Sequence, residues 1–574
     1  MLQISDQTPF CTNELYMIEK IMRQAKGCPG TRLRQYLYSV LALLFIVSIG
    51  ACGGNNVKSL KSQPKLDSNY IYSYIKDEPR FKQELDWAKK FYRERKFQLG
   101  WFKDNELVPQ AEQMLSVISK ADEDGLDPKD YQIKDFKKLF ESLDKAQKDT
   151  AEFRELQKEI DVALSATYFV WASDFYRGRV VPRENRNVQW DVKRNKIKLH
   201  KALATVLQFR KSKYYYADFE PLHPQYTNLK KSLAVYRGIK NAGGWPAIPK
   251  GTTLKPGANS PVVKTLRKRM LIPGENADTA NNTVYDTKLV AAVKSFQLSQ
   301  GLTPDGQVRG ETLRLLNIPI DQRIKTIILN MERWRWIPKS FEPDYLIVNI
   351  PKYELKVYEK AQEKVNMKVI VGKTMNSTPI FSDKLEYVVL SPYWNVPMSI
   401  LQKELVPNLI NNPNYLERLD MEVVTAKNEY VDPASIDWAS INEKNFKYIV
   451  RRRPGPKNDL GDVKFIFPNT NDVYLHDTPH DQLFSKASRD FSHGCVRVER
   501  PIDLAVYLLR NVPGYNRSKI KSIISERKEK YVPVKQKLPV YLVYFTAEAD
   551  AKGNVSFFED IYGHDKVLAS QYFK

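Results

Sequence analysis

Residues 474–479 read Tyr-Leu-His-Asp-Thr-Pro, and residues 491–497 read Phe-Ser-His-Gly-Cys-Val-Arg. The first run is typical of the end of a strand and the second begins a new element, so the side chains of His476 and Cys495 could meet. Gly494 lets the backbone bend tightly beside the thiol. The N–H groups of Gly494 and Cys495 could then face a negative charge that develops on a carbonyl oxygen. The two runs therefore predict a site that combines a thiol with an imidazole.

Histidine is rare in this chain except around Cys495. The sequence has six histidines, and His476, His480 and His493 lie within 20 residues of that cysteine. A thiolate needs a nearby base or cation at neutral pH, and both His476 and His493 are candidates. Zinc binding is the rival interpretation, but no Cys-x-x-Cys or His-Glu-x-x-His spacing occurs. Spacing favours nucleophilic catalysis without a metal or cofactor, and it leaves a metal site and a structural thiol open.

The start of the chain indicates export. Residues 37–51 form a 15-residue apolar run after Arg32 and Arg34, too short to span a bilayer comfortably but suited to the core of a signal peptide. The run ends in Ile49-Gly50-Ala51-Cys52, which resembles a bacterial lipobox, where cleavage exposes a cysteine that is lipidated. We expect a lipoprotein signal peptide over 1–51, lipidation of Cys52 and a flexible tether over 52–68. An uncleaved anchor or an ordinary signal peptide is the alternative.

The predicted cleavage site separates the four cysteines into three groups. Cys11 and Cys28 lie in the segment that would be removed, and Cys52 would carry the lipid. Cys495 would be the single free thiol of the mature protein, so it could not form an internal disulfide. A lone thiol in an oxidising compartment is a liability unless it is inert or used. The cysteine count therefore raises the expectation that Cys495 is catalytic.

Length and composition limit the class of protein. A chain of 574 residues suggests three or four units, and its hydrophobic content of 42% is enough for real cores. A mean hydropathy of -0.49 excludes a polytopic membrane protein. The net charge is +23, but lysine and arginine are spread along the chain and no nucleic-acid module appears. We expect a solvated basic surface and no nucleic-acid partner.

Periodicity divides the chain into helical and β-rich regions. Residues 69–250 read as mainly helical, with helical spacing over 81–95, 111–121 and 151–176, and residues 251–318 have the spacing of three short helices. Short β-rich runs follow at 345–350, 354–358, 367–371, 387–390, 465–467 and 473–476, which favours a mostly antiparallel sheet. A helical and irregular insertion occupies about 401–450, a helix is expected at 502–509, and residues 531–574 read as C-terminal strands. The prediction is a multidomain α+β chain.

The spacing from His476 to the run Ser492-His493-Gly494-Cys495-Val496-Arg497 resembles the signature of the L,D-transpeptidase catalytic domain. Further runs that are similar to this family are Tyr393-Trp394-Asn395-Val396-Pro397, Pro454-Gly455 with Asn458, Leu460-Gly461, Lys464-Phe465-Ile466-Phe467-Pro468-Asn469, Asp477-Thr478-Pro479 and Leu483-Phe484. Residues 251–318 resemble the peptidoglycan-binding domain type 1. The runs Asp124-Gly125-Leu126, Gly178-Arg179-Val180 and Gly243-Gly244-Trp245-Pro246 resemble the scaffold part of the large periplasmic subfamily.

The resemblance covers roughly residues 75–565 and implies a domain order. A helical scaffold domain would occupy 69–250, a small three-helix peptidoglycan-binding domain 251–318, and a β-rich catalytic domain 343–530 whose insertion at 401–450 caps the substrate cleft. The implied activity is an acyl transfer that forms 3→3 cross-links in peptidoglycan. Cys495 would attack the third residue of a stem tetrapeptide and release D-alanine, and the amine of another stem would resolve the thioester.

The same resemblance assigns roles to the residues around the thiol. His476 would accept and return the proton, oriented by the backbone carbonyl of Asp477. His493, Gly494 and Tyr474 would build the oxyanion and substrate environment. Ser492 would hydrogen-bond within the loop next to the substrate, and Arg497 would orient a substrate carboxylate or fix the loop, with a structural salt bridge as its alternative.

Two alternative functions are also consistent with the sequence. An L,D-carboxypeptidase would resolve the same thioester with water, and an idle lipid-anchored protein would only bind peptidoglycan. The expected location is the periplasm, at the outer membrane, because Gly53 and Gly54 follow Cys52 without an aspartate. Family members often have glutamine where this chain has Arg452, and the added charge would alter the choice of acceptor or be neutral surface.

Overall fold

The computed structural model describes residues 64–574 apart from 77–78, 83, 132–133, 149, 185–196, 209–222, 271–281, 338–340 and 574. The signal peptide over 1–51, the lipid site Cys52, the two cysteines before it and most of the tether lie outside the described residues. Of the helices that are described, none is both long enough and apolar enough to cross a bilayer.

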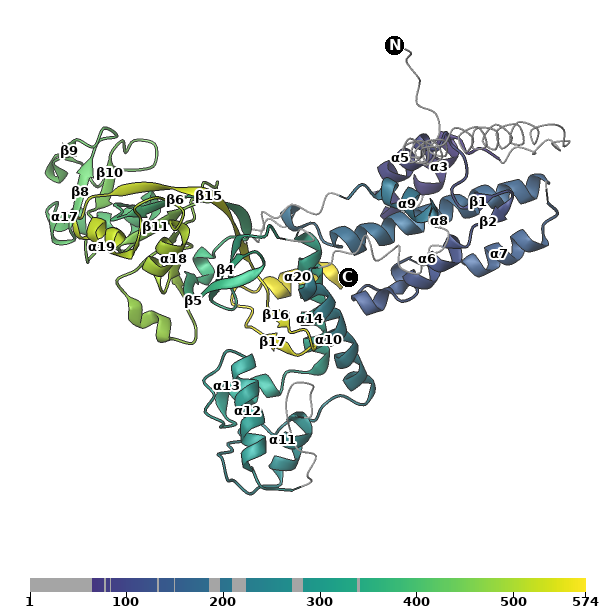
Figure 1. Ribbon diagram of the computed structural model, residues 1–574, viewed down its shortest axis with the longest axis horizontal. Helices are drawn as coiled ribbons and strands as arrows, with labels where there is room; N and C mark the ends of the chain where they lie inside the picture. Colours follow the sequence, from purple (N-terminus) through teal and green to yellow (C-terminus); the bar gives the residue numbers. More distant parts are fainter. Residues whose placement is uncertain are drawn as a thin grey trace, which may run out of the picture. The chain divides into compact units, whose positions relative to one another are not determined.

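The first half of the described chain is helical (Figure 1). Its helices are α3 (Ser68–Lys76), α4 (Pro79–Lys82), α5 (Leu85–Glu94), α6 (Gln110–Ile118), α7 (Phe136–Lys145), α8 (Ala151–Arg177), α9 (Leu199–Gln208) and α10 (Pro224–Asn241), with short helical turns η1 (Ala121–Asp124), η2 (Pro128–Tyr131) and η3 (Pro182–Glu184) and a hairpin of β1 (Phe102–Lys103) and β2 (Glu106–Leu107). The three predicted helical patterns correspond to α5, α6 and α8. Helix α8 is buried along most of its length because α3, α5, α6, α7 and α9 pack around it.

A small helical unit follows and has its own core. It contains α11 (Val262–Met270), α12 (Thr287–Ser299) and α13 (Gly310–Leu316), which confirms the prediction of three short helices. The side chain of Asp286 accepts the N–H of Leu289 and caps α12, and the hydroxyl of Tyr285 donates to the carbonyl of Gly306 at 2.7 Å. Gly306 has φ 73°, a conformation that favours glycine.

Helix α14 (Ile320–Trp336) joins this unit to the β-rich region and was not predicted. It lies beside α10 (Figure 1) and contacts α8 and the C-terminal α20 (His564–Tyr572). Its Arg335 is fully buried, donates to the carbonyl of Asp124 at 2.5 Å and pairs with Glu332 at 3.2 Å. The hydroxyl of Tyr572 donates to the carbonyl of Gly125 at 3.1 Å. The end of the chain is thus hydrogen-bonded to the helical region near its start.

A nine-stranded sheet with the order β13-β5-β14-β12-β11-β6-β15-β3-β4 forms the β-rich region. Its strands are β3 (Tyr345–Asn349), β4 (Glu354–Glu359), β5 (Gln362–Gly372), β6 (Phe381–Leu390), β11 (Val463–Ile466), β12 (Leu475–His476), β13 (Asp490–Ser492), β14 (Val496–Val498) and β15 (Lys530–Val543). Most neighbours are antiparallel, as predicted, but β12–β14, β13–β5 and β15–β3 are parallel pairs. Strand β5 also pairs with β4, so the strand order returns on itself.

Helices cover parts of this sheet. Helix α18 (Pro501–Leu508) packs on β11, and α19 (Arg517–Ser525) packs on β6. Short helical turns η5 (Thr374–Asn376) and η8 (Asp481–Ser485) lie in the connections. The predicted helix at 502–509 therefore corresponds to α18.

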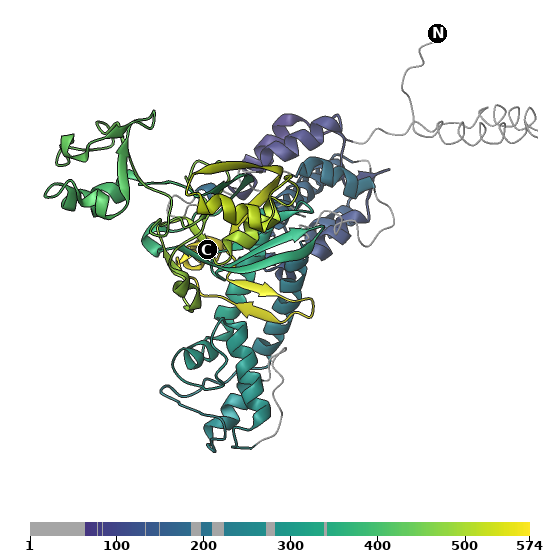
Figure 2. The ribbon, with the colours of Figure 1, turned by 60° about the vertical axis from the view of Figure 1, so that its left-hand side comes forward.

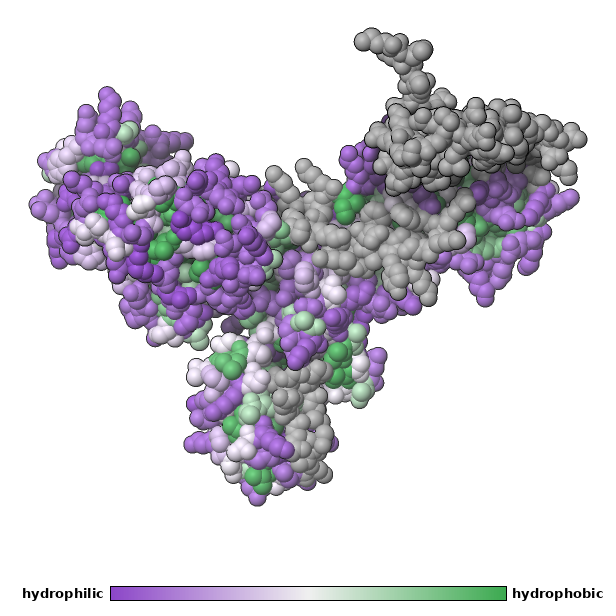
Figure 3. Space-filling model, viewed as in Figure 1, coloured by the Kyte–Doolittle hydropathy of each residue, from purple (hydrophilic) through white to green (hydrophobic). Residues whose placement is uncertain are grey.

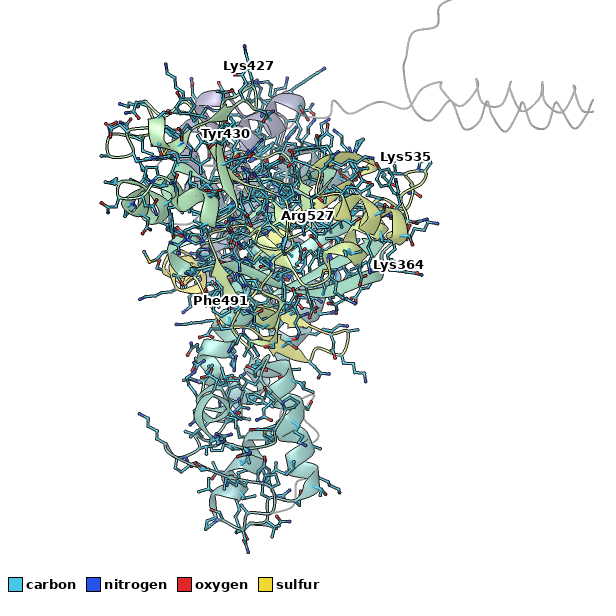
Figure 4. The ribbon with its side chains drawn as sticks, turned by 90° about the vertical axis from the view of Figure 1, so that its left-hand side faces the viewer. Lys364, Lys427, Tyr430, Phe491, Arg527 and Lys535 are labelled. Carbon is cyan, nitrogen blue, oxygen red and sulfur yellow. The ribbon has the colours of Figure 1, made fainter. Side chains whose placement is uncertain are left out.

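The insertion differs in part from the prediction. It begins with helical turns, as expected: α15 (Met398–Ile400), η6 (Leu401–Leu405), α16 (Val406–Leu409) and α17 (Tyr415–Arg418). The strands β8 (Met421–Val424), β9 (Tyr430–Val431) and β10 (Ile449–Arg452) follow, with the turn η7 (Pro433–Ser435). They form a small sheet with β7 (Trp394–Asn395), which precedes the helical turns, in the order β7-β10-β8-β9. Figure 4 labels Lys427 and Tyr430 on the β8–β9 hairpin. These strands have at most four residues each, too few to show an alternating pattern in the sequence.

The C-terminal segment also departs from the expectation of strands over 531–574. Strand β15 belongs to the main sheet, between β6 and β3. A short hairpin of β16 (Ala547–Ala549) and β17 (Val555–Phe557) follows, and the chain then ends in helix α20. In α20 the buried apolar side chains are Leu568 and Tyr572, and this stripe is too short to reveal a helix by periodicity.

The apolar side chains of the described residues form three clusters. The largest spans the helical region and the main sheet, a second fills the small helical unit, and the third lies inside the insertion. On the face that Figure 3 shows, the exposed hydrophobic side chains occur in small separate groups among hydrophilic ones. The predicted multidomain α+β architecture is confirmed.

Candidate active site

Three neighbouring strands carry the candidate catalytic residues. In the strand register, His476 of β12 lies opposite Arg497 of β14 on one side and opposite Lys464 of β11 on the other. The first N–H of β14 donates to the carbonyl of Tyr474 at 3.1 Å, which sets Cys495 beside Tyr474. Residues two apart on a strand share a face. All five side chains therefore project from one face of the sheet.

His476 is a buried and neutral imidazole. Its side chain is 4% exposed, and its Nδ1 lies 2.6 Å from the carbonyl oxygen of Asp477. The pKa of His476 is lowered to about 3, mainly by burial and then by the charges of Arg497 and Lys464, and the bond to Asp477 opposes this shift only in part. Because a carbonyl can only accept, Nδ1 carries the proton and Nε2 keeps a free lone pair. The contact with the Asp477 carbonyl that the sequence resemblance implied is present.

The thiol of Cys495 lies among hydrogen-bonding groups of β12 and the loop before it. Its Sγ donates to the carbonyl of Asp472 at 3.9 Å, and Tyr474 offers its backbone N–H and its hydroxyl to the sulfur. Burial raises the pKa of the Cys495 thiol, and the two Tyr474 bonds and the charge of Lys464 only partly offset this. With a raised thiol pKa and a lowered imidazole pKa, the resting pair is a neutral thiol and a neutral imidazole.

Lys464 belongs to a run that resembles the family, but the sequence analysis predicted no role for it at the site. Its Nζ lies 3.9 Å from the centroid of the Tyr474 ring, within the range of a cation–π contact. Burial lowers the pKa of Lys464, and the nearby acidic groups of Cys495, Glu529 and Asp472 act in the opposite direction. Only the pairing of β11 with β12 brings this lysine opposite His476, and a single sequence does not reveal that register.

Ser492 and Gly494 shape the loop that presents the thiol. The Ser492 hydroxyl donates to the carbonyl of Cys495 and accepts the N–H of Gly494 at 3.2 Å. The Thr378 hydroxyl donates to the carbonyl of Gly494 at 2.8 Å, which ties the loop to the end of β5. Gly494 has φ 115°, where any other residue would be strained. Of the two N–H groups expected to face an oxyanion, that of Gly494 is engaged by Ser492, whereas that of Cys495 has no acceptor among the described residues.

The side chain of Asp477 anchors the strand end that carries His476. Its two carboxylate oxygens accept the N–H groups of Asp462 and Thr478, each at 2.7 Å. A Cβ atom at Gly461 would lie 2.3 Å from the Asp477 carboxyl carbon, and Gly461 has φ 59°. Position 461 therefore has to be glycine, because any larger residue would clash with the carboxylate of Asp477. This contact links the Leu460-Gly461 run to the run that contains His476 and Asp477.

His493 is placed differently from His476. It is exposed, and its Nε2 lies 3.4 Å from Oε1 of Glu404 on η6 of the insertion. Neither His493 nor His476 is among the groups named above as hydrogen-bonding to Cys495 or shifting its pKa. Figure 4 labels Phe491, which precedes this loop on β13. By strand register His476 lies on the sheet face that carries Cys495, whereas His493 lies next to Glu404 of the insertion.

The two arginines noted in the sequence have different surroundings. Burial lowers the pKa of Arg497, and its Nε is buried without a hydrogen-bond partner among the described residues. Arg452 donates to the carboxylate of Asp459 and, at 3.0 Å, to the carbonyl of Lys457. The guanidinium of Arg452 also lies 5.4 Å from the ring centroid of Trp394. The charge at position 452 is therefore compensated, while Arg497 keeps donor capacity beside the thiol.

Histidines elsewhere in the described chain have structural surroundings. His200 lies 3.3 Å from Glu94, and His223 caps α10 while its ring stacks on Trp334 at 4.1 Å. His564 begins α20. Within the described ranges, no group of three or more His, Cys, Asp or Glu side chains is arranged to hold a metal ion.

Three family models match consecutive parts of the chain. Residues 86–233 match a "Scaffold domain", residues 259–316 match a "Putative peptidoglycan binding domain", and residues 343–521 match an "L,D-transpeptidase catalytic domain". The third match contains the whole site described above. The resemblance that the sequence motifs indicated is confirmed.

Individual relatives point in the same direction. A curated protein of Haemophilus influenzae named "Putative L,D-transpeptidase" is 34% identical over 287 residues, which are 49% of this chain and 58% of that protein. The match thus spans less than two thirds of that relative. Two solved L,D-transpeptidases are similar at low identity: one from Stackebrandtia nassauensis (11% identity, 50% of this chain, 94% of that chain, TM-score 0.20) and one from Xylanimonas cellulosilytica (14% identity, 51% of this chain, 99% of that chain, TM-score 0.16). The family assignment rests on the three models and the H. influenzae relative.

Proposed function

We propose that this chain, whose residues 343–521 match the L,D-transpeptidase catalytic domain, cross-links peptidoglycan through a thioester on Cys495. The observation that carries this proposal is the relation between the thiol and His476. His476 is the last residue of β12, and Cys495 immediately precedes the adjacent parallel strand β14. The imidazole has a free Nε2 lone pair on the face that carries the thiol. This arrangement suits proton removal from sulfur as it attacks a carbonyl carbon.

The first half of the reaction is acyl transfer to sulfur. The Cys495 sulfur attacks the carbonyl carbon between the third residue, a diamino acid, and the terminal D-alanine of a stem tetrapeptide, and His476 Nε2 takes the thiol proton. The carbonyl oxygen becomes an oxyanion, for which the free N–H of Cys495 is a donor. When the C–N bond breaks, His476 returns the proton to the leaving D-alanine amine, and the thioester remains.

The second half transfers the acyl group to an amine. The side-chain amine of a second stem attacks the thioester, His476 accepts a proton from that amine, and the sulfur leaves and is reprotonated. The product is a 3→3 cross-link. Arg497, with its buried Nε unpartnered among the described residues, is suited to hold a carboxylate of the stem peptide next to the thiol. Ser492, Gly494 and Tyr474 would hold the loop and line the substrate.

Electrostatics favour a concerted first step. A free imidazolium at position 476 would stand beside Arg497 and Lys464, whose charges both disfavour it. Lys464 favours negative charge on the sulfur and lies on the ring of Tyr474. Proton transfer to His476 would therefore proceed together with formation of the C–S bond rather than before it.

The remainder of the chain would deliver the site to its substrate. Domains that act on peptidoglycan imply a cell-envelope location. We assign 1–51 to a lipoprotein signal peptide, Cys52 to lipidation, 52–68 to a tether, 69–250 to the scaffold, 251–318 to peptidoglycan binding and 343–530 to catalysis with a cap at 401–450. The protein would be periplasmic and anchored at the outer membrane. The mass of the N-terminal peptide from purified membranes tests the anchor, since Cys52→Ser should lack the lipid and leave the membrane fraction.

Mass spectrometry of products from a purified disaccharide tetrapeptide tests the activity. The wild-type chain should release D-alanine and form 3→3 dimers, and it should pass through an acyl adduct on Cys495. Cys495→Ala and His476→Ala should form no dimer, whereas His480→Ala, which changes an exposed histidine close by, should act as the wild type does. A dimer formed by Cys495→Ala would refute the nucleophile. Tripeptide without dimer would assign the carboxypeptidase reaction instead, and unchanged substrate would leave only peptidoglycan binding.

A further inference from the structure

A second polar cavity lies apart from the thiol. It has a volume of about 430 Å³ and is lined by residues of α10, α12 and the β16–β17 hairpin, together with Arg269 of α11 and Arg323 of α14. Figure 1 labels these helices and strands, and Figure 2 shows them from another side. None of its lining residues belongs to the catalytic strands or to the loop of Cys495. Its size is within the range of cavities that bind small molecules.

Arg323 is the unusual residue of this cavity. It is 6% exposed, its Nη2 donates to Oε1 of Gln300 at 2.9 Å and to the carbonyl of Leu315 at 3.2 Å, and its guanidinium lies 4.2 Å from the ring centroid of Phe557. Both acceptors are neutral, and no carboxylate of the described residues lies within ion-pair distance. Burial, together with the charge of Arg269, lowers the pKa of Arg323 to about 9. Burying a guanidinium without an anion costs free energy, so an anion bound next to Arg323 would stabilise the protein.

Arg269 brings a second positive charge to the same cavity. It is 1% exposed, its Nε donates to the carbonyl of Leu316 at 2.6 Å, and its guanidinium lies 4.0 Å from the ring centroid of Trp245. The two arginines therefore present their guanidinium groups from different helices, each held in place by a carbonyl and an aromatic ring. Such fixed planar donors suit the two oxygens of a carboxylate.

The acidic residues of the lining are engaged elsewhere. The two oxygens of Glu548 accept hydrogen bonds from Asn349 and Lys352, each at 2.8 Å. Asp550 accepts the N–H groups of Lys552 and Asn554 within its own turn, at 2.8 and 2.9 Å. Among the described residues, neither of these carboxylates compensates Arg323, so its guanidinium can take an anionic ligand.

We propose that this cavity binds a free carboxylate of a peptidoglycan stem peptide, held between Arg323 and Arg269. The wall of the cavity formed by α11 and α12 belongs to the part of the chain that matches the peptidoglycan binding model, and stem peptides carry free carboxylates. The choice of ligand rests on the proposed function, because it takes the polymer from that reaction. The site would hold one strand of the wall while Cys495 acts on another stem.

Ligand-dependent thermal unfolding of the full chain tests the proposal. The probes are the stem tripeptide, the same tripeptide with all of its carboxylates amidated, and inorganic phosphate. The tripeptide can also bind at the catalytic site, so its affinity is compared between variants. The proteins compared are the wild type, Arg323→Met, and Arg314→Met as a matched control. Arg314 is exposed, pairs with Glu311 and does not line the cavity. We expect Arg323→Met to lose the higher-affinity phase of tripeptide stabilisation, at least tenfold, and Arg314→Met to keep it.

Further readouts separate a binding role from a structural one. Without ligand, Arg323→Met should unfold at the wild-type temperature or above it, because a buried unpaired charge has been removed; a lower unfolding temperature would assign Arg323 to structure alone. Equal tripeptide binding by Arg323→Met, equal binding of the amidated tripeptide, or stabilisation by phosphate alone would each overturn the proposal. Arg323→Lys, which keeps the charge but not the planar fork, should bind with intermediate affinity. Arg323→Met should form dimers from soluble tetrapeptide at the wild-type rate. If the wild-type chain itself forms no dimer, the proposed function is refuted, but the binding site at Arg323 is not.

Discussion

The state of the resting thiol is open to direct measurement. Burial holds the pKa of Cys495 above its ordinary value, while His476 is neutral with a pKa of about 3. A thiol with an ordinary pKa of about 8.5 is only about 3% ionised at pH 7, and Cys495 should be ionised less than this. A thiolate–imidazolium pair would instead have a thiol pKa in the range of about 3.5–7.5 and be largely ionised at that pH.

The pH dependence of alkylation by iodoacetamide distinguishes the two states. In a chain that begins at residue 64, Cys495 is the single cysteine, so labelling reports this thiol alone. The rate should rise roughly tenfold per pH unit from pH 6 to pH 8, without a plateau below pH 8. His476→Gln should leave this profile nearly unchanged, because a neutral ring contributes no charge to the thiol pKa. A plateau near pH 6 in the wild type, lost in His476→Gln, would refute the neutral pair.

Further substitutions test the rest of the site and its support. Lys464→Met should raise the pKa of Cys495 and slow alkylation at pH 8, with recovery at higher pH, and Lys464→Arg should behave nearly as the wild type does. Gly494→Ala should lose about 1–3 kcal/mol of unfolding free energy in urea, because alanine at φ 115° is strained. The folded pKa of His476, about 3, is below its unfolded value of 6.5, so its contribution to stability is complete above pH 6.5 and falls as the pH drops; about 2 kcal/mol should be lost by pH 5, and His476→Gln should flatten that slope in urea titrations. Tyr572→Phe removes a buried hydrogen bond to a backbone carbonyl and should cost about 1 kcal/mol by the same titration.

Local patterns predicted much of the fold. The helical spacing of 151–176 became α8, and the β-rich run at 387–390 became the end of β6. These elements were visible because their periodicity is long or their residues strongly favour strands. The strands of the insertion and α20 were missed because two to four buried positions are too few to reveal the regular spacing of apolar residues.

The sequence predicted contacts between residues that are close along the chain, and it missed contacts between residues that are far apart along the chain. The loop around Cys495 and the carbonyl contact of His476 with the next residue depend on neighbours in the sequence. Lys464 depends on the pairing of β11 with β12, and Arg323 on the approach of α14 to Gln300 and Phe557. Such contacts are set by strand register and helix packing, which one sequence does not report.

The bond between Tyr572 and Gly125 joins residues 447 positions apart. During synthesis a chain emerges from its N-terminus, and domains that depend on local contacts fold first. Here the large apolar cluster that includes the helical region also takes in Leu568 and Tyr572 of α20. The helical region can therefore reach its final packing only after α20 has been synthesised, which makes its stability depend on a segment far along the chain.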